Sequence, residues 1–364
     1  MTSIASIPLT ASGIRFTSLP PLSLYIHIPW CVKKCPYCDF NSHEAKGAHP
    51  EKQYVAALIH DLEQAIPQIY GRKVHSVFFG GGTPSLFSAA AIDDILAAVR
   101  ALVRPEANAE ITLEANPGTF EAEKFSAYAK SGINRLSIGI QSFNPTHLKA
   151  LGRIHDDNEA RRAIDIAKHN FDNFNLDIMY ALPQQTLAEA LQDIDTALSF
   201  KPPHLSAYHL TLEPNTLFFR HPPKLPDDEL AADMQQAIEK KLSDAGYENY
   251  ETSAFAQLDK RCKHNVNYWQ FGDYLGIGAG AHSKISNKNN ILRMMRHKHP
   301  QAYLDSVARA EHVQEEHQVS HNELPFEFMM NALRLREGFA VPLFQERTSL
   351  PLSVMEQELH QAES

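Results

Sequence analysis

Short runs of β-branched and aromatic residues alternate with longer amphipathic stretches through residues 24–210. Six of the runs predict strands: Leu24–Ile28, Val74–Phe79, Ala109–Glu114, Arg135–Ile140, Phe174–Tyr180 and Leu205–Leu210. Five stretches between them have the apolar period of helices: Glu51–Ile66, Ala89–Leu102, Glu121–Lys130, Asn158–His169 and Leu187–Ser199. Because repeated strand–helix units need crossover connections, the pattern predicts an α/β fold with a parallel sheet.

A parallel sheet of this kind is compatible with a doubly wound fold or with a barrel. The choice comes from the residues at the strand ends. Glycines follow the second predicted strand, Glu114 ends the third, Gln141 follows the fourth, and Asp177 lies within the fifth. Polar and glycine residues gather at the carboxyl ends of strands in barrel proteins, where their binding sites are built. We therefore predict a partial (β/α)₆ barrel.

The rest of the chain predicts a division into four parts. The first 20 residues are rich in Ser and Thr and predict a flexible leader, followed by the barrel over residues 21–215. Residues 201–226 are rich in proline, which indicates a boundary. We assign residues 216–310 to an extension of the barrel. Helical patterns then predict a small C-terminal, mainly helical domain over residues 311–364.

Composition narrows the class of protein without identifying a chemistry. The chain has 364 residues, of which 43% are hydrophobic and 21% are charged, as in soluble globular proteins. Its formal net charge of −9 argues against nucleic-acid binding. No apolar run approaches the roughly 18 residues that a membrane-spanning helix requires. Three of the four cysteines are clustered, which fits a reducing compartment and predicts a cytoplasmic protein.

The clustered cysteines are the clearest chemical feature. Cys31, Cys35 and Cys38 follow the first predicted strand with C-x₃-C-x₂-C spacing. Thiolates this close together favour an iron–sulfur cluster or zinc. A zinc site would need a fourth ligand, which His43 could supply, and disulfide bonds are a third alternative. Phe40 stands where a further cysteine could have been, so a cluster held by three thiolates would keep one iron open to a substrate.

The cysteine motif and the strand before it resemble the signature of a known family. The cysteine motif, together with Tyr25-x-His27-Ile28-Pro29-Trp30 before it, resembles the signature of radical S-adenosylmethionine (SAM) enzymes. It is most similar to the branch that contains oxygen-independent coproporphyrinogen III oxidase, and within that branch to the HemW-type proteins, which are regarded as haem chaperones. The resemblance extends from about Leu22 to the C-terminus. It implies the partial barrel, a [4Fe-4S] cluster on the three cysteines, and a small winged-helix-like C-terminal domain that looks incomplete here.

The resemblance also implies a set of SAM-binding residues. The run Gly80-Gly81-Gly82-Thr83-Pro84 is similar to the motif that holds the SAM amino group, and glycines let the backbone approach a ligand closely. Arg153 matches a position that binds the SAM carboxylate, which suits its fork of donors. The implied SAM-binding residues are Tyr25, Gly81, Gly82, Thr83, Glu114, Gln141, Arg153 and Asp177. Among them, the resemblance implies that the Glu114 carboxylate lies near the ribose.

A second motif lies outside the predicted barrel repeats. His264-Asn265-Val266-Asn267-Tyr268-Trp269 matches HNxxYW, which resembles the haem-binding element of HemW-type proteins. An imidazole can bind haem iron, and aromatic rings can lie against a porphyrin. On chemistry alone, a histidine beside aromatic residues is more often a packed, hydrogen-bonded residue than an iron ligand. With the resemblance, we assign His264, Tyr268 and Trp269 to haem, and we expect Cys262 to be a buried free thiol.

Two other segments carry simpler expectations. The glycine-rich run 274–283 lacks the βαβ context of a dinucleotide site, so we interpret it as a closely packed loop. The basic residues near the end of the extension are expected to form a solvated surface, with a contact to propionates or to an acidic partner as the alternative; they are Arg293, Arg296, His297, Lys298 and His299.

Two functions follow from the resemblance. The first is a haem chaperone that passes haem to an acceptor haem protein, implied to be respiratory, through which it would associate peripherally with a membrane. The second is an oxygen-independent coproporphyrinogen III oxidase. Phe40 and the short segment before the first strand depart from the oxidase pattern. If SAM is cleaved, an electron donor such as flavodoxin or ferredoxin is required.

Overall fold

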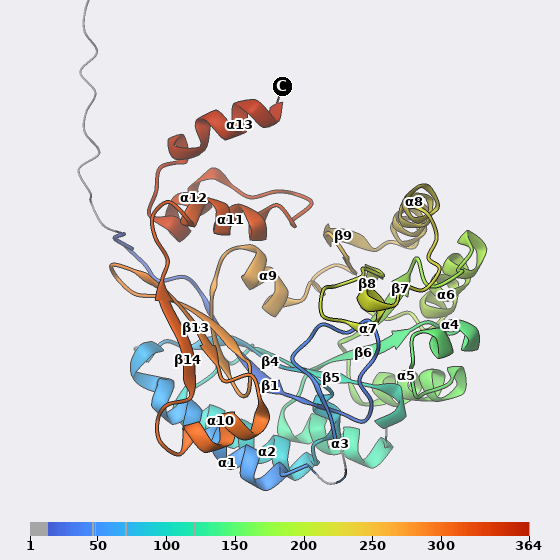
Figure 1. The fold of residues 1–364 in the computed structure, drawn as a ribbon, viewed down its shortest axis with the longest axis horizontal. Coiled ribbons are helices and arrows are strands. Elements are labelled where there is room, and N and C mark those ends of the chain that lie inside the picture. Colours follow the sequence, from blue (N-terminus) through green and yellow to red (C-terminus); the bar gives the residue numbers. More distant parts are fainter. Residues whose placement is uncertain (1–13, 46, 48, 70, 120, 364) are drawn as a thin grey trace, which may run out of the picture.

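A computed structural model describes residues 14–45, 47, 49–69, 71–119 and 121–363. Its main element is a mixed sheet of 12 strands in the order β14-β13-β12-β11-β1-β4-β5-β6-β7-β8-β10-β9 (Figure 1). The strands are β1 (Leu22–Ile28), β4 (Val74–Gly81), β5 (Glu110–Ala115), β6 (Arg135–Gln141), β7 (Phe174–Tyr180), β8 (His204–His209), β9 (Glu248–Glu251), β10 (Ala254–Ala256), β11 (Asp273–Ile277), β12 (His282–Ser286), β13 (Ile291–Arg296) and β14 (Val313–Gln318).

The centre of the sheet confirms the predicted fold class. All six predicted strands form, and they lie side by side and parallel, from β1 through β4 to β8. The predicted helices also form, each within a residue or so of its expected bounds: α1 (Glu51–Ala65), α2 (Ala89–Leu102), α3 (Ala122–Ser131), α5 (Asp157–Asn170) and α6 (Leu187–Ser199). Within the described residues no pairing joins the edge strands β14 and β9, so the barrel is open.

Further elements connect these units. The helical ones are α4 (Pro145–Ala150), α7 (Leu217–Arg220), α8 (Asp228–Asp244), α9 (Lys263–Trp269), α10 (Pro300–Val307) and the 3₁₀ turns η1 (Ile66–Ile69), η2 (Pro84–Leu86) and η3 (Pro117–Thr119). A separate two-stranded pairing joins β2 (Trp30–Cys31) to β3 (His43–Glu44) and so closes the base of the cysteine loop. Within the described residues, none of the helices has the length and apolar content that crossing a bilayer requires.

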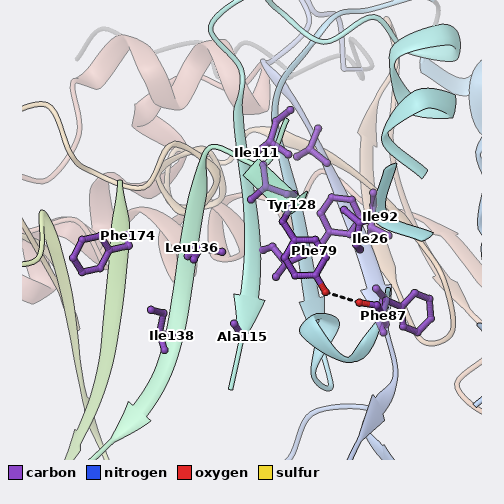
Figure 2. Packing of buried hydrophobic residues seen from close by; sticks show 14 of the residues in the cluster. Ile26, Phe79, Phe87, Ile92, Ile111, Ala115, Tyr128, Leu136, Ile138 and Phe174 are labelled. Atoms are coloured by element: carbon purple, nitrogen blue, oxygen red, sulfur yellow. Dashed lines mark hydrogen bonds between the residues drawn. The ribbon is translucent and has the colours of Figure 1, made fainter. Parts of the chain in front are cut away.

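The two faces of the sheet differ in chemistry. Residues such as Ile26, Phe79 and Leu136 point to the outer face and are buried against the helices, as Figure 2 shows. There the Tyr128 hydroxyl donates a hydrogen bond to the carbonyl of Phe87. Full burial of one such apolar side chain contributes about 1.5–3 kcal/mol. Because side chains alternate along a strand, the intervening residues point to the inner face, and these are largely polar.

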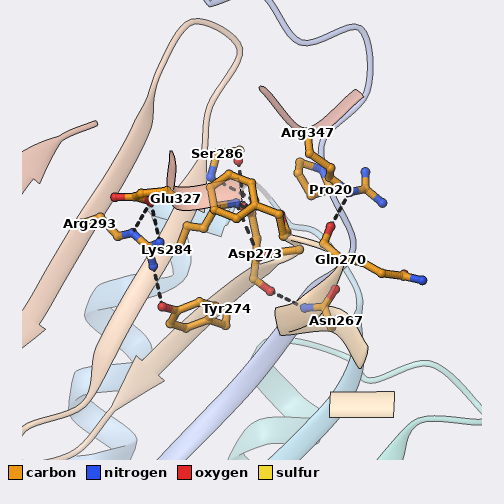
Figure 3. Close-up of polar contacts among 12 residues, drawn as sticks. Pro20, Asn267, Gln270, Asp273, Tyr274, Lys284, Ser286, Arg293, Glu327 and Arg347 are labelled. Carbon is orange, nitrogen blue, oxygen red and sulfur yellow. Dashed lines mark hydrogen bonds and ion pairs between the residues drawn. The ribbon is translucent and has the colours of Figure 1, made fainter. Parts of the chain in front are cut away.

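The extension joins the same sheet, so the sheet continues across the predicted boundary between residues 215 and 216. Strand β11 pairs in parallel with β1, and β12, β13 and β14 continue in antiparallel order. Asp273 at the start of β11 is buried and accepts hydrogen bonds from Lys284 and Ser286 (Figure 3). The division into four domains stays a prediction.

One expectation for the basic segment is wrong. Arg296 is fully buried, not solvated, and its guanidinium donates two hydrogen bonds to one oxygen of Asp61, at 3.1 and 2.9 Å. Asp61 comes from α1, so the pair fastens the first helix to the extension. A local run of basic residues gives no sign of this pairing, because its partner lies 235 residues away. Lys298 and His299, by contrast, are exposed.

The predicted helical C-terminal region is confirmed. It contains α11 (Leu324–Ala332), α12 (Val341–Thr348), η4 (Leu352–Met355) and α13 (Glu356–Glu363). Its buried side chains, including Phe328 and Phe344, form a cluster that also takes in Ile14 and Phe16. Side-chain packing therefore begins by Ile14, before the predicted end of the leader, whereas residues 1–13 lie outside the described residues.

Candidate functional site

A cavity of about 1020 Å³ lies along the inner face of the sheet. This is at the upper end of the volumes of ligand sites, about 300–1,000 Å³. The three clustered cysteines line it, as do all the residues assigned to SAM and two of the three assigned to haem. The open barrel thus brings the two motifs together, although they lie more than 200 residues apart in the sequence.

The cysteine loop forms one wall of the cavity. Cys31, Cys35 and Cys38 are free and partly buried, and burial raises the pKa of the Cys31 and Cys38 thiols. In the described part of the chain no three His, Cys, Asp or Glu side chains surround a common point at the spacing of one metal ion. A cubane cluster does not need such a point, since each thiolate would hold a different iron. His43, the alternative zinc ligand, is not among the residues that line this cavity.

The glycine motif places backbone where side chains would not fit. Strand β4 ends at Gly81, whose φ of +113° favours glycine and whose added Cβ would lie 2.4 Å from the His27 ring. At Gly82, an added Cβ would lie 2.5 Å from the carbonyl oxygen of Trp30. The motif is therefore pressed against the segment that leads into the cysteine loop.

Replacing Gly82 should test this close approach. In Gly82→Ala the methyl group must displace the Trp30 backbone, so we expect SAM affinity to fall at least tenfold and the thermal unfolding temperature to drop. Gly118→Ala is the matched control, because an added Cβ there meets nothing closer than 3.5 Å. Calorimetric SAM titration and thermal unfolding measure both effects. Equal SAM binding by the two variants would contradict the assigned role of the motif.

Two carboxylates face the cavity from neighbouring parts of the sheet. Glu114 on β5 accepts a hydrogen bond from the Gly81 amide at 3.2 Å, and burial raises its pKa to about 8, with a further contribution from the nearby charge of Asp177. Asp177 on β7 accepts hydrogen bonds from Ser137 and Asn175 at 3.0 and 2.8 Å. Burial raises the pKa of Asp177 as well. Both groups are costly to ionise until a ligand supplies donors.

This predicts pH-dependent SAM binding. The resemblance assigns Glu114 to the ribose, whose hydroxyls donate to a carboxylate, so the free protein must lose a proton before it binds SAM. Since the pKa of Glu114 is raised to about 8, affinity should rise with pH and level off above about 8. Below that pH it should fall by up to about tenfold per unit. Titrations between pH 6 and 9 check this, and Glu114→Gln should remove the dependence. The same slope in that variant would assign the proton elsewhere.

Arg153 links the residues assigned to SAM to the cysteine loop. Its guanidinium donates to the carbonyl of Gly139 at 2.6 Å and to the side chain of Asn116, and it lies 3.8 Å from the Cys35 sulfur. Gln141, at the end of β6, has a φ of +68°, which costs a non-glycine residue about 1–3 kcal/mol. A register shift between Gly139 and Gln141 accompanies it. Such local strain is typical of binding sites.

The HNxxYW motif forms helix α9, which packs on β1, β4 and β11. His264 is only 2% exposed, stacks on Phe78, and meets Ser76 Oγ through Nδ1 at 3.1 Å. Its Nε2 is buried and has no hydrogen-bond partner among the described residues. Burial lowers its pKa to about 3, so the ring is neutral.

Only two of the three residues assigned to haem line the cavity. Tyr268 lies beside His264, with ring centroids 5.0 Å apart, and both line the cavity. Trp269 is not among the lining residues; the guanidinium of Arg334 lies over its ring, 4.3 Å from the centroid. Cys262 is buried, as expected, and its thiol is 3.5 Å from Glu110.

Sequence reasoning missed several residues of the cavity. Arg135 begins a predicted strand, yet it is fully buried and lines the cavity. His27 lies within the quoted motif; its ring contacts Tyr25, and its Nε2 donates a hydrogen bond to the carbonyl of Asn41 at 2.8 Å. The spacing of these residues along the strands could have identified them. Side chains at every second position share one face of a strand, so Arg135 and Ser137 lie on the same face as Gln141.

Comparison with known proteins gives the family. The Radical SAM superfamily profile matches residues 25–197 and the HemN C-terminal domain profile matches residues 319–363. The chain is 50% identical over 347 residues to the heme chaperone HemW of Haemophilus influenzae, covering 94% of this chain and 90% of that protein. It is 49% identical to the heme chaperone HemW of Escherichia coli, with the same coverage.

A mammalian relative and a solved structure extend the comparison. The mouse mitochondrial radical S-adenosyl methionine domain-containing protein 1 is 40% identical over 72% of this chain and 60% of its own length. Coproporphyrinogen III oxidase (HemN) from Escherichia coli has the same fold, with a TM-score of 0.79, 24% identity, and coverage of 92% of this chain and 80% of that one. The identity and the coverage of the bacterial relatives place the chain in the HemW family of radical SAM proteins.

Proposed function

We propose that the chain is a haem chaperone, which binds haem in the inner cavity of a radical SAM scaffold and passes it to an acceptor haem protein. The proposed acceptor is a haem protein of the respiratory chain. The observation that carries this is His264, a buried neutral imidazole that lines the same cavity as the cysteine loop and whose Nε2 has no partner in the described part of the chain. A buried polar atom without a hydrogen-bond partner costs the folded protein about 1–3 kcal/mol. A ligand that bonds to Nε2 would remove this cost, so the unpaired atom favours a binding site. The name of the bacterial relatives supports the same function.

The scaffold supplies places for two further cofactors. Cys31, Cys35 and Cys38 would hold a [4Fe-4S] cluster, and Glu114, Arg153 and the glycine motif would hold SAM beside it. When bound, the cluster supplies electrons to SAM. The chain's own residues orient SAM and keep water from it; an electron donor such as flavodoxin or ferredoxin completes the system if SAM is cleaved. We place the protein in the cytoplasm, with membrane association only through the acceptor.

Coproporphyrinogen III oxidation is the second candidate. It is favoured by the intact cysteine triad, which faces a cavity with room for a porphyrin. Phe40 argues against it. Its side chain is 60% exposed, at the position where the resemblance gives the oxidases a fourth cysteine.

One experiment separates the two functions. The cluster is reconstituted anaerobically, haem is titrated by its Soret band with and without SAM, and coproporphyrinogen decarboxylation is assayed in the same sample. We expect tight haem binding without turnover. Turnover with weak haem binding would make the protein an enzyme and would leave HNxxYW a structural motif.

A further inference from the structure

The cavity has a floor with its own chemistry. The cysteine loop and the glycine motif lie at the carboxyl ends of the parallel strands. Arg135 is the first residue of β6, and Ser76, which contacts His264, is near the start of β4. Arg135 and His264 therefore lie at the amino-end side of the cavity, which we call the cavity floor. Each is only 2% exposed, and both line the cavity.

Arg135 is a buried cation with an incomplete set of partners. Its Nε makes no hydrogen bond to any residue that the structure describes, and its ion-pair partner, Glu110, lies 3.9 Å away, beyond hydrogen-bond distance. The Glu110 oxygens are occupied by the start of α9: they accept from the amides of Lys263 and His264 at 3.2 Å each. Buried guanidinium groups normally have paired, hydrogen-bonded carboxylates. Within the described residues, the floor therefore offers the Arg135 Nε no hydrogen-bonded anion.

His264 faces the same space with a hydrogen-bond donor. The Asn267 amide nitrogen donates to the carbonyl of Asp273 at 2.8 Å, which fixes the orientation of the amide, and also to Ser23 Oγ at 3.0 Å. Ser23 lies 2.7 Å from Ser76, which lies 3.1 Å from His264 Nδ1. A chain of hydroxyls that begins at a donor runs most favourably in one direction. Ser23 then donates to Ser76, Ser76 donates to Nδ1, and the ring proton stays on Nε2.

We propose that Arg135 and His264 form a carboxylate-binding subsite on the cavity floor, which takes one propionate of a bound haem. The inference rests on the proposed function and deepens it. A propionate would accept from the Arg135 guanidinium and from the His264 Nε2–H, satisfying both groups at once. His264 would then bind the edge of the porphyrin rather than its iron.

The surroundings of the subsite suit one anion. Of the acidic groups that face it, Glu110 accepts hydrogen bonds from the start of α9. Burial raises the pKa of Asp177 and raises that of Glu114 to about 8, which disfavours a negative charge on either carboxyl group. His204 is neutral and already hydrogen-bonded on both ring nitrogens, to Asn175 and Tyr250. Arg135 therefore supplies positive charge to a ligand here.

The test uses the reconstituted full-length chain and three probes: haem, metal-free protoporphyrin IX and haem dimethyl ester. His264→Ala should weaken the binding of haem and of metal-free protoporphyrin alike, by about ten- to a hundredfold, as expected for a hydrogen bond to a charged group. Haem dimethyl ester should bind the wild type more weakly than haem does. His264→Ala should bind the ester as tightly as the wild type does. His264→Gln keeps an N–H donor and should restore much of the affinity, with an unchanged haem spectrum.

Further variants keep the result interpretable. Arg135→Lys retains the charge but loses the fork, and it should reduce affinity for both free-acid porphyrins; circular dichroism establishes that it folds. His60→Ala, at an exposed histidine of α1, is the control. If His264→Ala weakened haem but not metal-free protoporphyrin, or weakened the ester equally, the subsite would be refuted and iron ligation favoured. Failure of the wild type to bind any of the probes would refute the proposed function itself.

Discussion

Cys35→Ala is expected to abolish the broad visible absorbance of the reconstituted iron–sulfur cluster. Cys35 lies between Cys31 and Cys38 in a loop that supplies three thiolates to one side of the cavity. With one thiolate gone, a cubane would have two protein ligands and two open irons, which is too few to hold it. Iron content after anaerobic reconstitution and desalting should fall to near zero, and SAM binding should fall with it.

Cys262→Ala is the matched control, because it removes a thiol that is buried far from this loop in the sequence. It should retain the cluster in full. Circular dichroism of both variants separates loss of the cluster from loss of the fold. A full complement of iron in Cys35→Ala would show that the loop is not the site of the cluster.

Asp61→Ala is expected to reduce the free energy of unfolding by about 3–5 kcal/mol, the typical effect of breaking a buried ion pair. Asp61 is completely buried. It accepts hydrogen bonds from Arg296, from the Tyr303 hydroxyl at 2.9 Å and from the Gly278 amide at 3.1 Å. One carboxylate therefore joins α1 to β13, α10 and the loop after β11. Its removal leaves the Arg296 charge buried and uncompensated. Urea unfolding measures the loss.

An exposed ion pair provides the contrast. Lys240 and Asp244, one turn apart on α8, meet at 2.7 Å but are 75% and 65% exposed. Asp244→Ala should change the free energy of unfolding by no more than about 0.5 kcal/mol. A loss below about 1 kcal/mol in Asp61→Ala would mean that the pairing of β11 with β1, together with apolar packing, holds the extension to the barrel without help from this ion pair.

The sequence was sufficient for the central barrel because two local signals agree there. The first signal is the apolar runs, such as Phe174–Tyr180, that form the strands. The second is the side-chain caps at the helix starts: the capping boxes at Asp156 and Thr186 fix where α5 and α6 begin. The cysteine and glycine motifs are also local, so their spacing alone predicted their placement at strand ends. The structure places all eight residues assigned to SAM along one cavity.

What the sequence could not give are pairings between distant segments. Nothing near Leu22 indicates that β11 will lie beside it, and nothing near Arg296 points to Asp61. Trp269 belongs to the same motif as His264, yet the helical turn directs it away from the cavity toward Arg334. The sequence pattern marks Arg135 only as part of a strand. Buried strands are usually apolar, but the inner face of this open barrel is polar, so a buried arginine there is not expected from the pattern.

The position of β1 between β4 and β11 also has a consequence for biosynthesis. β1 pairs with β11, which follows about 250 residues later, so a ribosome that adds about 5–20 residues per second needs about 12–50 s to produce the second partner. During that interval the strand that leads into the cysteine loop has an unpaired edge, exposed to other nascent chains. Cluster insertion is therefore expected to follow release of the finished polypeptide rather than to accompany its synthesis.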